Sequence, residues 1–180
     1  DAPPIFTINP VTVTQISCFG ANDGSISLNF QGGQEPIDFE WEDDPNAGVD
    51  RNNLGPGTYT INITDSEPCT ISETFVIFEP LELTLSGNVI DALDCDDPNS
   101  GSINLFISGG TPPFEFLWSN GATTEDLNNI PPGSYQVEVT DINNCSQSQS
   151  FDVIRPSDIV IDVATETLVN CDDLSVAQSF

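Results

Sequence analysis

The sequence predicts an all-β protein built from tandem β-sandwich repeats. The first observation is a repeated segment, because GTYTINITDSEPC at residues 57–69 recurs as GSYQVEVTDINNC at residues 133–145. The second is the alternation of apolar and polar residues in these segments, which is typical of half-buried strands. The third is the spacing of turn signals, since glycine, proline, asparagine and aspartate interrupt the chain about every 8 to 12 residues. No segment has a sustained helical period, so we expect no helices.

The repeat extends over most of the chain. The offset between equivalent residues is 77 as far as the tryptophans and 76 beyond them, so Trp41 corresponds to Trp118 and Tyr59 to Tyr135. These are the only tryptophans and tyrosines in the sequence. Three prolines, each 15 residues before a cysteine, mark where the repeats begin. We therefore expect a first repeat at 1–80, a second at 81–156 and the opening of a third at 157–180, as in a piece cut from a longer array.

Within the first repeat we expect strands at residues 25–31, 36–42, 58–64 and 72–78, and one short strand between residues 43 and 57. The strand at 58–64 and its counterpart open with a tyrosine directly after Pro-Gly, which suits a tyrosine corner. The alternative is that Tyr59 and Tyr135 are ordinary core aromatics. Trp41 and Trp118 each end an apolar strand, which favours a place in the core over a sugar-binding surface.

Each complete repeat contains two cysteines. A domain of this size buries a modest core, so a covalent staple would help it to fold. The simplest connectivity is Cys18 with Cys69 and Cys95 with Cys145, which leaves the partner of Cys171 beyond the sequence; the alternative is five free thiols. Four strand crossings between Cys18 and Cys69 would return the chain to the end of the sandwich where it started. Such pairing would place the protein in an oxidising, extracellular setting.

The charge of the chain excludes several classes of partner. The net charge is −27, Arg51 and Arg155 are the only cations, and there is no histidine. Such a surface repels nucleic acid and anionic membranes, and no apolar run is long enough for a membrane helix. It attracts cations and keeps a long array soluble. The partners that we expect are neighbouring repeats of the same chain and an unidentified surface or glycan ligand.

The sequence resembles the SprB repeat, which occurs in tandem in giant surface adhesins of gliding and other Bacteroidota. The residues that carry the resemblance are CFGANDGSI with the following GG, P and W, and WSNGATTEDLNNIPPGSYQVEVTDINNC in the second repeat. The first repeat departs from the pattern at residues 42–53. The resemblance implies an immunoglobulin-like domain, secretion to the cell surface by the type 9 system, and adhesive or stalk duty in gliding motility or attachment.

Catalysis has little support in the sequence. Without histidine there is no Ser-His-Asp or Cys-His pair, and without lysine there is no phosphate-binding loop of the Walker type. We therefore expect no enzyme. The one cofactor that we consider is calcium, a hard cation that carboxylates could hold. Calcium prefers six to eight oxygen ligands, and several loops are rich in them; the alternative is that these loops are solvated turns. The predicted calcium ligands are Asp94, Asp96, Asp97, Asn99, Asp141 and Asn143.

Two functions fit these observations. The first is a non-enzymatic stalk or adhesive segment of a large secreted surface protein. The second is an array of carbohydrate- or ligand-binding modules attached to a secreted enzyme. A binding array should carry exposed aromatic residues in one set of loops, whereas the variable loop at residues 42–53 is acidic and has none. The sequence therefore favours the stalk.

Overall fold

The computed structural model describes residues 7–67, 69–92 and 97–155, and it contains strands and no helix in these ranges. The first repeat consists of β1 (Thr7–Thr14), β2 (Gly24–Gln31), β3 (Asp38–Trp41), β4 (Arg51–Leu54), β5 (Gly57–Thr64) and β6 (Thr70–Ile77). The second consists of β7 (Thr84–Ile90), β8 (Gly101–Ser108), β9 (Phe114–Trp118), β10 (Leu127–Ile130), β11 (Gly133–Asp141) and β12 (Ser146–Val153). No helix in the described ranges could cross a membrane.

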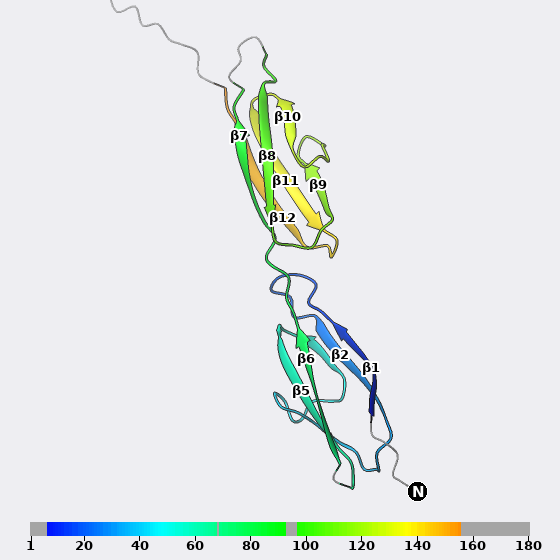
Figure 1. Cartoon of the computed structure of the whole chain (residues 1–180). Coiled ribbons are helices and arrows are strands. Elements are labelled where there is room, and N and C mark those ends of the chain that lie inside the picture. The colour runs from blue at the N-terminus through cyan, green and yellow to red at the C-terminus, as the bar shows by residue number, and fades with distance from the viewer. Residues whose placement is uncertain (1–6, 68, 93–96, 156–180) are drawn as a thin grey trace, which may run out of the picture.

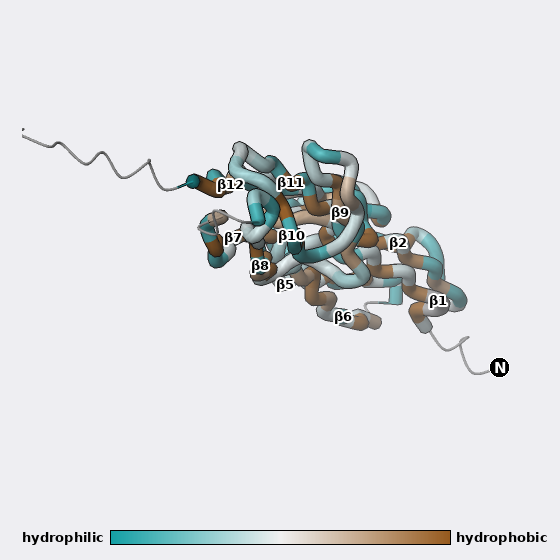
Figure 2. The backbone as a smooth tube through the Cα atoms, turned by 90° about the horizontal axis from the view of Figure 1, so that it is seen from above, coloured by the Kyte–Doolittle hydropathy of each residue, from teal (hydrophilic) through white to brown (hydrophobic). Residues whose placement is uncertain are grey.

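Each repeat is an immunoglobulin-like sandwich of two antiparallel sheets. In the first repeat β1-β2-β4 faces β3-β5-β6, and in the second β10-β8-β7 faces β12-β11-β9. This arrangement corresponds to strands A, B and E packed on strands C, F and G of the immunoglobulin fold, with strand D absent. The predicted strands are confirmed, including the short one, β4, between residues 43 and 57. Brown and lighter bands alternate along β1 and β2 in Figure 2, as expected of strands with one buried face.

The predicted strands did not include β1, which contains Pro10. Proline cannot donate to a ladder, so a proline inside an apparent strand argues against that strand. The structure tolerates Pro10 because β1 is at the edge of its sheet and its register with β2 shifts between Ile8 and Val11. Proline is found at such edges and bulges.

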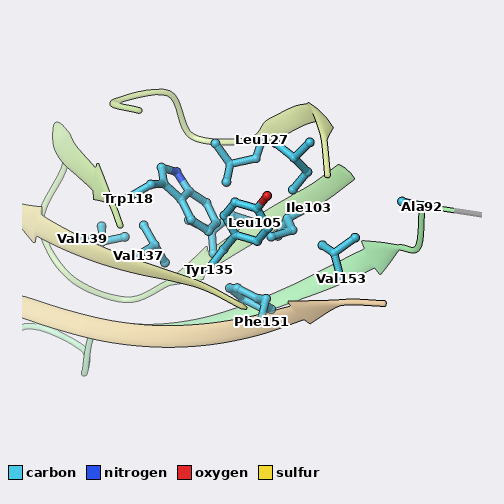
Figure 3. Close-up of a cluster of buried hydrophobic side chains, with 11 residues drawn as sticks. Ala92, Ile103, Leu105, Trp118, Leu127, Tyr135, Val137, Val139, Phe151 and Val153 are labelled. Carbon is cyan, nitrogen blue, oxygen red and sulfur yellow. The ribbon is translucent and has the colours of Figure 1, made fainter. Parts of the chain in front are cut away.

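The core of each repeat is built around its tryptophan. Trp41 and Trp118 are 0% and 1% exposed, and they lie among the inward-facing residues of both sheets. Figure 3 shows Trp118 beside Val137 and Leu105 in the second repeat. Each indole N–H donates to a loop carbonyl, from Trp41 to Gly48 at 2.9 Å and from Trp118 to Thr124 at 2.8 Å. The prediction of core tryptophans is confirmed.

The tyrosine corner is also confirmed in both repeats. The Tyr59 hydroxyl donates to the carbonyl of Gly55 at 3.0 Å, and the Tyr135 hydroxyl donates to the carbonyl of Pro131 at 2.8 Å. In each case the acceptor is four residues upstream, at the turn between the fourth and fifth strands of the repeat. This bond fixes the connection between the two sheets.

The two sandwiches are stacked end to end (Figure 1). Every strand pairing in the described residues lies within one repeat, so the repeats meet only through loops and turns. We call the end of a repeat where β2 or β8 begins its early-cysteine end, because Cys18 precedes β2. We call the opposite end its late-cysteine end. The early-cysteine end of the first repeat faces the late-cysteine end of the second.

Candidate functional site

The most specific chemical feature of the molecule lies between the two repeats. A disulfide joins Cys18, in the loop between β1 and β2, to Cys145, in the turn between β11 and β12. The two Cα atoms are 5.7 Å apart, which is an ordinary separation for a disulfide, and the cysteines are 127 residues apart in the sequence. The bridge links the two sandwiches covalently at their point of contact.

This finding corrects the predicted pairing within repeats. Cys145 is bonded to Cys18 and not to Cys95, and Cys69 is a free, exposed thiol. The pairs Cys18–Cys69 and Cys95–Cys145 are therefore wrong. Cys95 and Cys171 lie outside the described residues, and the partner of Cys171 stays a prediction.

The predicted pairing was wrong because the two short strands β3 and β4 together make a single crossing from one end of the sandwich to the other. β3 begins opposite the end of β5 and stops at Trp41, opposite Ile61 in the middle of β5. β4 begins near Ile26 in β2 and runs on to Gly24, where β2 begins. Three crossings therefore separate the two cysteines of a repeat, and an odd number leaves them at opposite ends. The count of strands was right, but the directions of β3 and β4 are the same.

A buried carboxylate holds the turn that presents Cys145. One oxygen of Asp141 accepts hydrogen bonds from the N–H groups of Asn143 and Cys145, both at 2.9 Å. The other oxygen accepts from the N–H of Thr111 at 2.9 Å, which ties the turn to the loop after β8. Asp141 is 4% exposed, and its N–H donates to the carbonyl of Cys145. Asp141 therefore positions the cysteine.

The first repeat has the same arrangement around Cys69. One oxygen of Asp65 accepts from the N–H groups of Glu67 at 3.0 Å and Cys69 at 2.9 Å, and the other accepts from the N–H of Gln34 at 3.1 Å. These bonds, above all the one from Gln34, lower the pKa of Asp65, because N–H donors favour the charged carboxylate. Sequence reasoning missed this role, although an aspartate four residues before the cysteine is common to both repeats.

The loop that presents Cys18 is ordered by its own hydrogen bonds. The carbonyl of Cys18 accepts from the N–H of Ala21, and Gly20 between them has φ of 77°, as the third position of a type II turn requires. The carboxylate of Asp23 accepts from both the hydroxyl and the N–H of Ser17, which lower the pKa of Asp23. Across the junction, the side-chain amide of Asn143 donates to the carbonyl of Ser17 at 3.2 Å.

The segment between β6 and β7 is bound to the early-cysteine end of the first repeat. The N–H of Phe78 donates to the side-chain carbonyl of Gln15 at 2.6 Å, and the N–H of Ile16 donates to the carbonyl of Phe78 at 3.2 Å. The carboxylate of Glu79 accepts from the N–H of Gly20 at 2.6 Å. The linker thus leaves the first repeat beside the Cys18 loop.

The same segment is bound to the second repeat at a pair of glycines. The N–H of Gly110 donates to the carbonyl of Leu81 at 2.9 Å. Gly109 has φ of 73°, and a Cβ there would clash with the carbonyl of Glu82. Only glycine therefore fits without strain where the linker passes the turn after β8. Linker, disulfide and the Asn143 amide together fix how the repeats meet.

The predicted calcium ligands are not brought together. Asp141 and Asn143 lie at the late-cysteine end of the second repeat, whereas Asp97 and Asn99 precede β8 at the other end. The eight residues of β8 lie between the two pairs, a length of about 25 Å. Asp97 instead accepts the N–H of Asn99 at 2.9 Å, as in an Asx turn, and no three metal-binding side chains cluster in the ranges that the structure describes. The other two predicted ligands, Asp94 and Asp96, lie outside the described residues.

Two segments of the chain match the family model of the SprB repeat. They are residues 11–46, from β1 to beyond Trp41, and residues 83–123, from just before β7 to beyond Trp118. Each segment includes the early cysteine and the core tryptophan of its repeat. A search of curated protein sequences found no match.

Several solved structures are similar in fold. A C-terminal 282-residue fragment of intimin, solved in complex with the intimin-binding domain of the translocated intimin receptor, is 13% identical with a TM-score of 0.42. The alignment covers 85% of this chain and 64% of the intimin fragment. Murine CEACAM1b is 14% identical with a TM-score of 0.34, over 82% of this chain and 100% of that one. An amphioxus IgVJ-C2 molecule is 13% identical with a TM-score of 0.34, over 85% of this chain and 98% of that one. The immunoglobulin-like assignment rests on the sheet order and the tyrosine corners described above.

Proposed function

The chain contains two SprB repeats, and from this we propose that it is a non-enzymatic stalk segment of a large secreted adhesin at the cell surface. The observation that carries the proposal is the disulfide between Cys18 and Cys145, which joins the repeats end to end. A stalk needs domains whose relative positions are fixed, and a covalent bond at the contact supplies this. Structural disulfides are also typical of proteins outside the cytoplasm.

The charge of the chain fits the same role. At −27, an extended array repels other copies of itself and stays soluble. The match to the SprB family supports a location at the cell surface. The proposal also includes secretion by the type 9 system and a part in gliding, which are properties of that family. The partners in this proposal are the neighbouring repeats of the chain, while other parts of the adhesin would bind the target surface.

A second candidate function is ligand binding by the second repeat. A shallow hollow there is lined by Phe106, Phe114, Phe116 and neighbouring residues, and Phe106 is 51% exposed. Exposed aromatic rings on a sandwich face suit the apolar faces of sugars. However, the residue equivalent to Phe106 in the first repeat is Asn29, so the hollow is not a property of both repeats. This favours the stalk.

Replacement of the two repeats within the full-length protein tests the proposal. Cells should lose adhesion, or adhere over a shorter reach, when the segment is deleted. They should recover when an unrelated pair of immunoglobulin-like domains of equal length takes its place. A stalk is interchangeable in this way, whereas a binding module is not. The binding function would be established instead by a different pattern of results. The unrelated domains would then fail to restore adhesion, the native segment would restore it, and its Phe106→Ala variant would not.

A further inference from the structure

The late-cysteine end of the first repeat has the features of the end that is bonded in the second. We propose that this end is a docking site for a further SprB repeat, whose early cysteine forms a disulfide with Cys69. The inference does not depend on whether the segment serves as a stalk. It implies that disulfides in such an array join each repeat to the next, and that none closes within a repeat.

The first support is the geometry of the turn. Asp65 accepts the N–H groups of Glu67 and Cys69 on one oxygen, as Asp141 does for the turn of Cys145. In both turns the carbonyl of the cysteine also accepts the aspartate N–H, at 3.1 Å for Cys69 and 2.9 Å for Cys145. The second oxygen of each aspartate holds the loop that follows β2 or β8. Cys69 is therefore presented by the same scaffold that presents a cysteine known in this structure to be bonded to another repeat.

The second support is the pair of glycines beside each turn. Gly33 has φ of 76° and Gly110 has φ of 65°, so the backbone takes the same left-handed conformation in both repeats. In the second repeat this conformation lets Gly110 donate to the linker that arrives from the first repeat. The first repeat keeps the same surface for a linker arriving from another repeat. A disulfide that closed within the repeat would not require this glycine conformation.

The third support is exposure. Cys145 is half-buried because the Cys18 loop covers it, whereas Cys69 is exposed and free. One contact at this end differs between the repeats, because Glu67 stands at the position of Asn143, whose amide donates to Ser17. A carboxylate cannot donate in that way, so we expect the proposed junction to form without this hydrogen bond.

Formation of the bond is an ordinary thiol–disulfide exchange. The Cys69 thiol and the thiol of the incoming repeat each lose a proton and together lose two electrons as the S–S bond forms. A small disulfide such as oxidised glutathione accepts the electrons and is released as two thiols. No other reactant is required.

A chain lengthened by one repeat provides the test. A copy of residues 1–80 is placed before residue 4, so that Pro80 of the copy takes the position of Pro3. Cys95 and Cys171 are replaced by serine to remove thiols outside the question. After refolding in a glutathione redox buffer, free thiols are alkylated under denaturing conditions and the disulfides are counted from the intact mass.

We expect two disulfides, Cys18 of the copy with Cys69 and the native Cys18 with Cys145. Cys69→Ser in the native part should remove one of them, whereas the matched substitution of Cys69 in the added copy should remove none. The opposite result, loss only in the matched control, would mean pairing within the repeat and would overturn the proposal. Detection of a single disulfide in the lengthened chain would overturn it as well. Retention of the Cys18–Cys145 bond in every variant shows that each chain has folded.

Discussion

Removal of the Cys18–Cys145 bridge by Cys145→Ser should destabilise both repeats, although the substituted residue belongs to only one of them. When the second repeat alone unfolds, the bridge and the folded first repeat still hold its two ends together. The loop that is closed then runs from Phe78, beside the Cys18 loop, to Cys145. It contains roughly 67 residues, and the chain-entropy relation gives about 4 kcal/mol for its closure. When the first repeat unfolds and the second stays folded, the bridge closes a loop of similar length, so it stabilises the first repeat by a similar free energy.

The two contributions do not add. When both repeats are unfolded, the bridge closes a single loop of 127 residues, for which the same relation gives about 5 kcal/mol. Most of the stabilisation by the bridge is therefore lost when the first repeat to unfold does so. The other repeat then unfolds at a lower free-energy cost than it would if the two repeats were independently stabilised. The oxidised chain should unfold more cooperatively than the variant, in which the repeats unfold separately.

Hydrogen exchange measured by mass spectrometry in urea resolves the two repeats and checks this prediction. The free energy of opening should fall by up to about 4 kcal/mol in the peptides of both repeats, which corresponds to roughly 15–30 °C in Tm for a domain of this size. Cys69→Ser is the matched control, because Cys69 is exposed and unbonded in this chain and its loss should leave both repeats unchanged. A fall confined to the second repeat would refute the reasoning, since this is what a staple within that repeat would produce.

Three further predictions concern the core, the junction and the cysteine turn. Trp118→Ala should cost roughly 3–5 kcal/mol of unfolding free energy, because a fully buried indole leaves a cavity; urea titration measures this, and an unchanged midpoint would contradict the core assignment. Gly109→Ala should slow the re-formation of the Cys18–Cys145 disulfide in the reduced chain, because the added Cβ clashes with the linker carbonyl of Glu82. Gly121→Ala is the control, since Gly121 has a similar positive φ but no neighbour within 4 Å. Equal rates for the two variants, measured by thiol trapping, would count against the linker contact. The Asp65 carboxylate should titrate below 3.8 by NMR, so its contribution to stability is present above about pH 4 and is lost as the pH falls through its lowered pKa; a midpoint at or above 3.8 would remove the role of the turn.

The features that the sequence predicted correctly depend on local pattern and on side-chain size. The strands at 25–31 and 58–64 follow from alternation, and Trp118 was placed in the core because a large apolar ring at the end of an apolar strand has few other places. The tyrosine corner at Tyr135 follows from Pro-Gly immediately before it. Each of these can be read within a short stretch of residues, so one sequence is sufficient.

The pairing of the cysteines could not be read in that way. It depends on whether β3 and β4 cross the sandwich in the same direction, and that is decided by the loop at residues 42–50, which has no strand of its own. It also depends on how one repeat meets the next, which the linker and Gly109 decide. The aspartate four residues before Cys69 and Cys145 was a signal of shared geometry at these turns, but it does not name the partner. The expectation that Asp141 and Asn143 lie beside Asp97 and Asn99 was wrong for the same reason, since it used the same count of crossings.

The bridge between Cys18 and Cys145 also determines how the molecule responds to tension. Because the two cysteines are 127 residues apart, a pull applied before Cys18 and after Cys145 passes through the bridge and bypasses nearly all of both sandwiches. Strands β2 to β11 lie between the two cysteines, so their unfolding releases no length between Cys18 and Cys145, whereas β1 and β12 lie outside the bridged loop. Reduction of the bridge would expose the intervening chain, whose extended length is about 430 Å. Between the two cysteines the oxidised segment therefore behaves as a tether of fixed length, whereas the reduced one lengthens by successive unfolding of its domains.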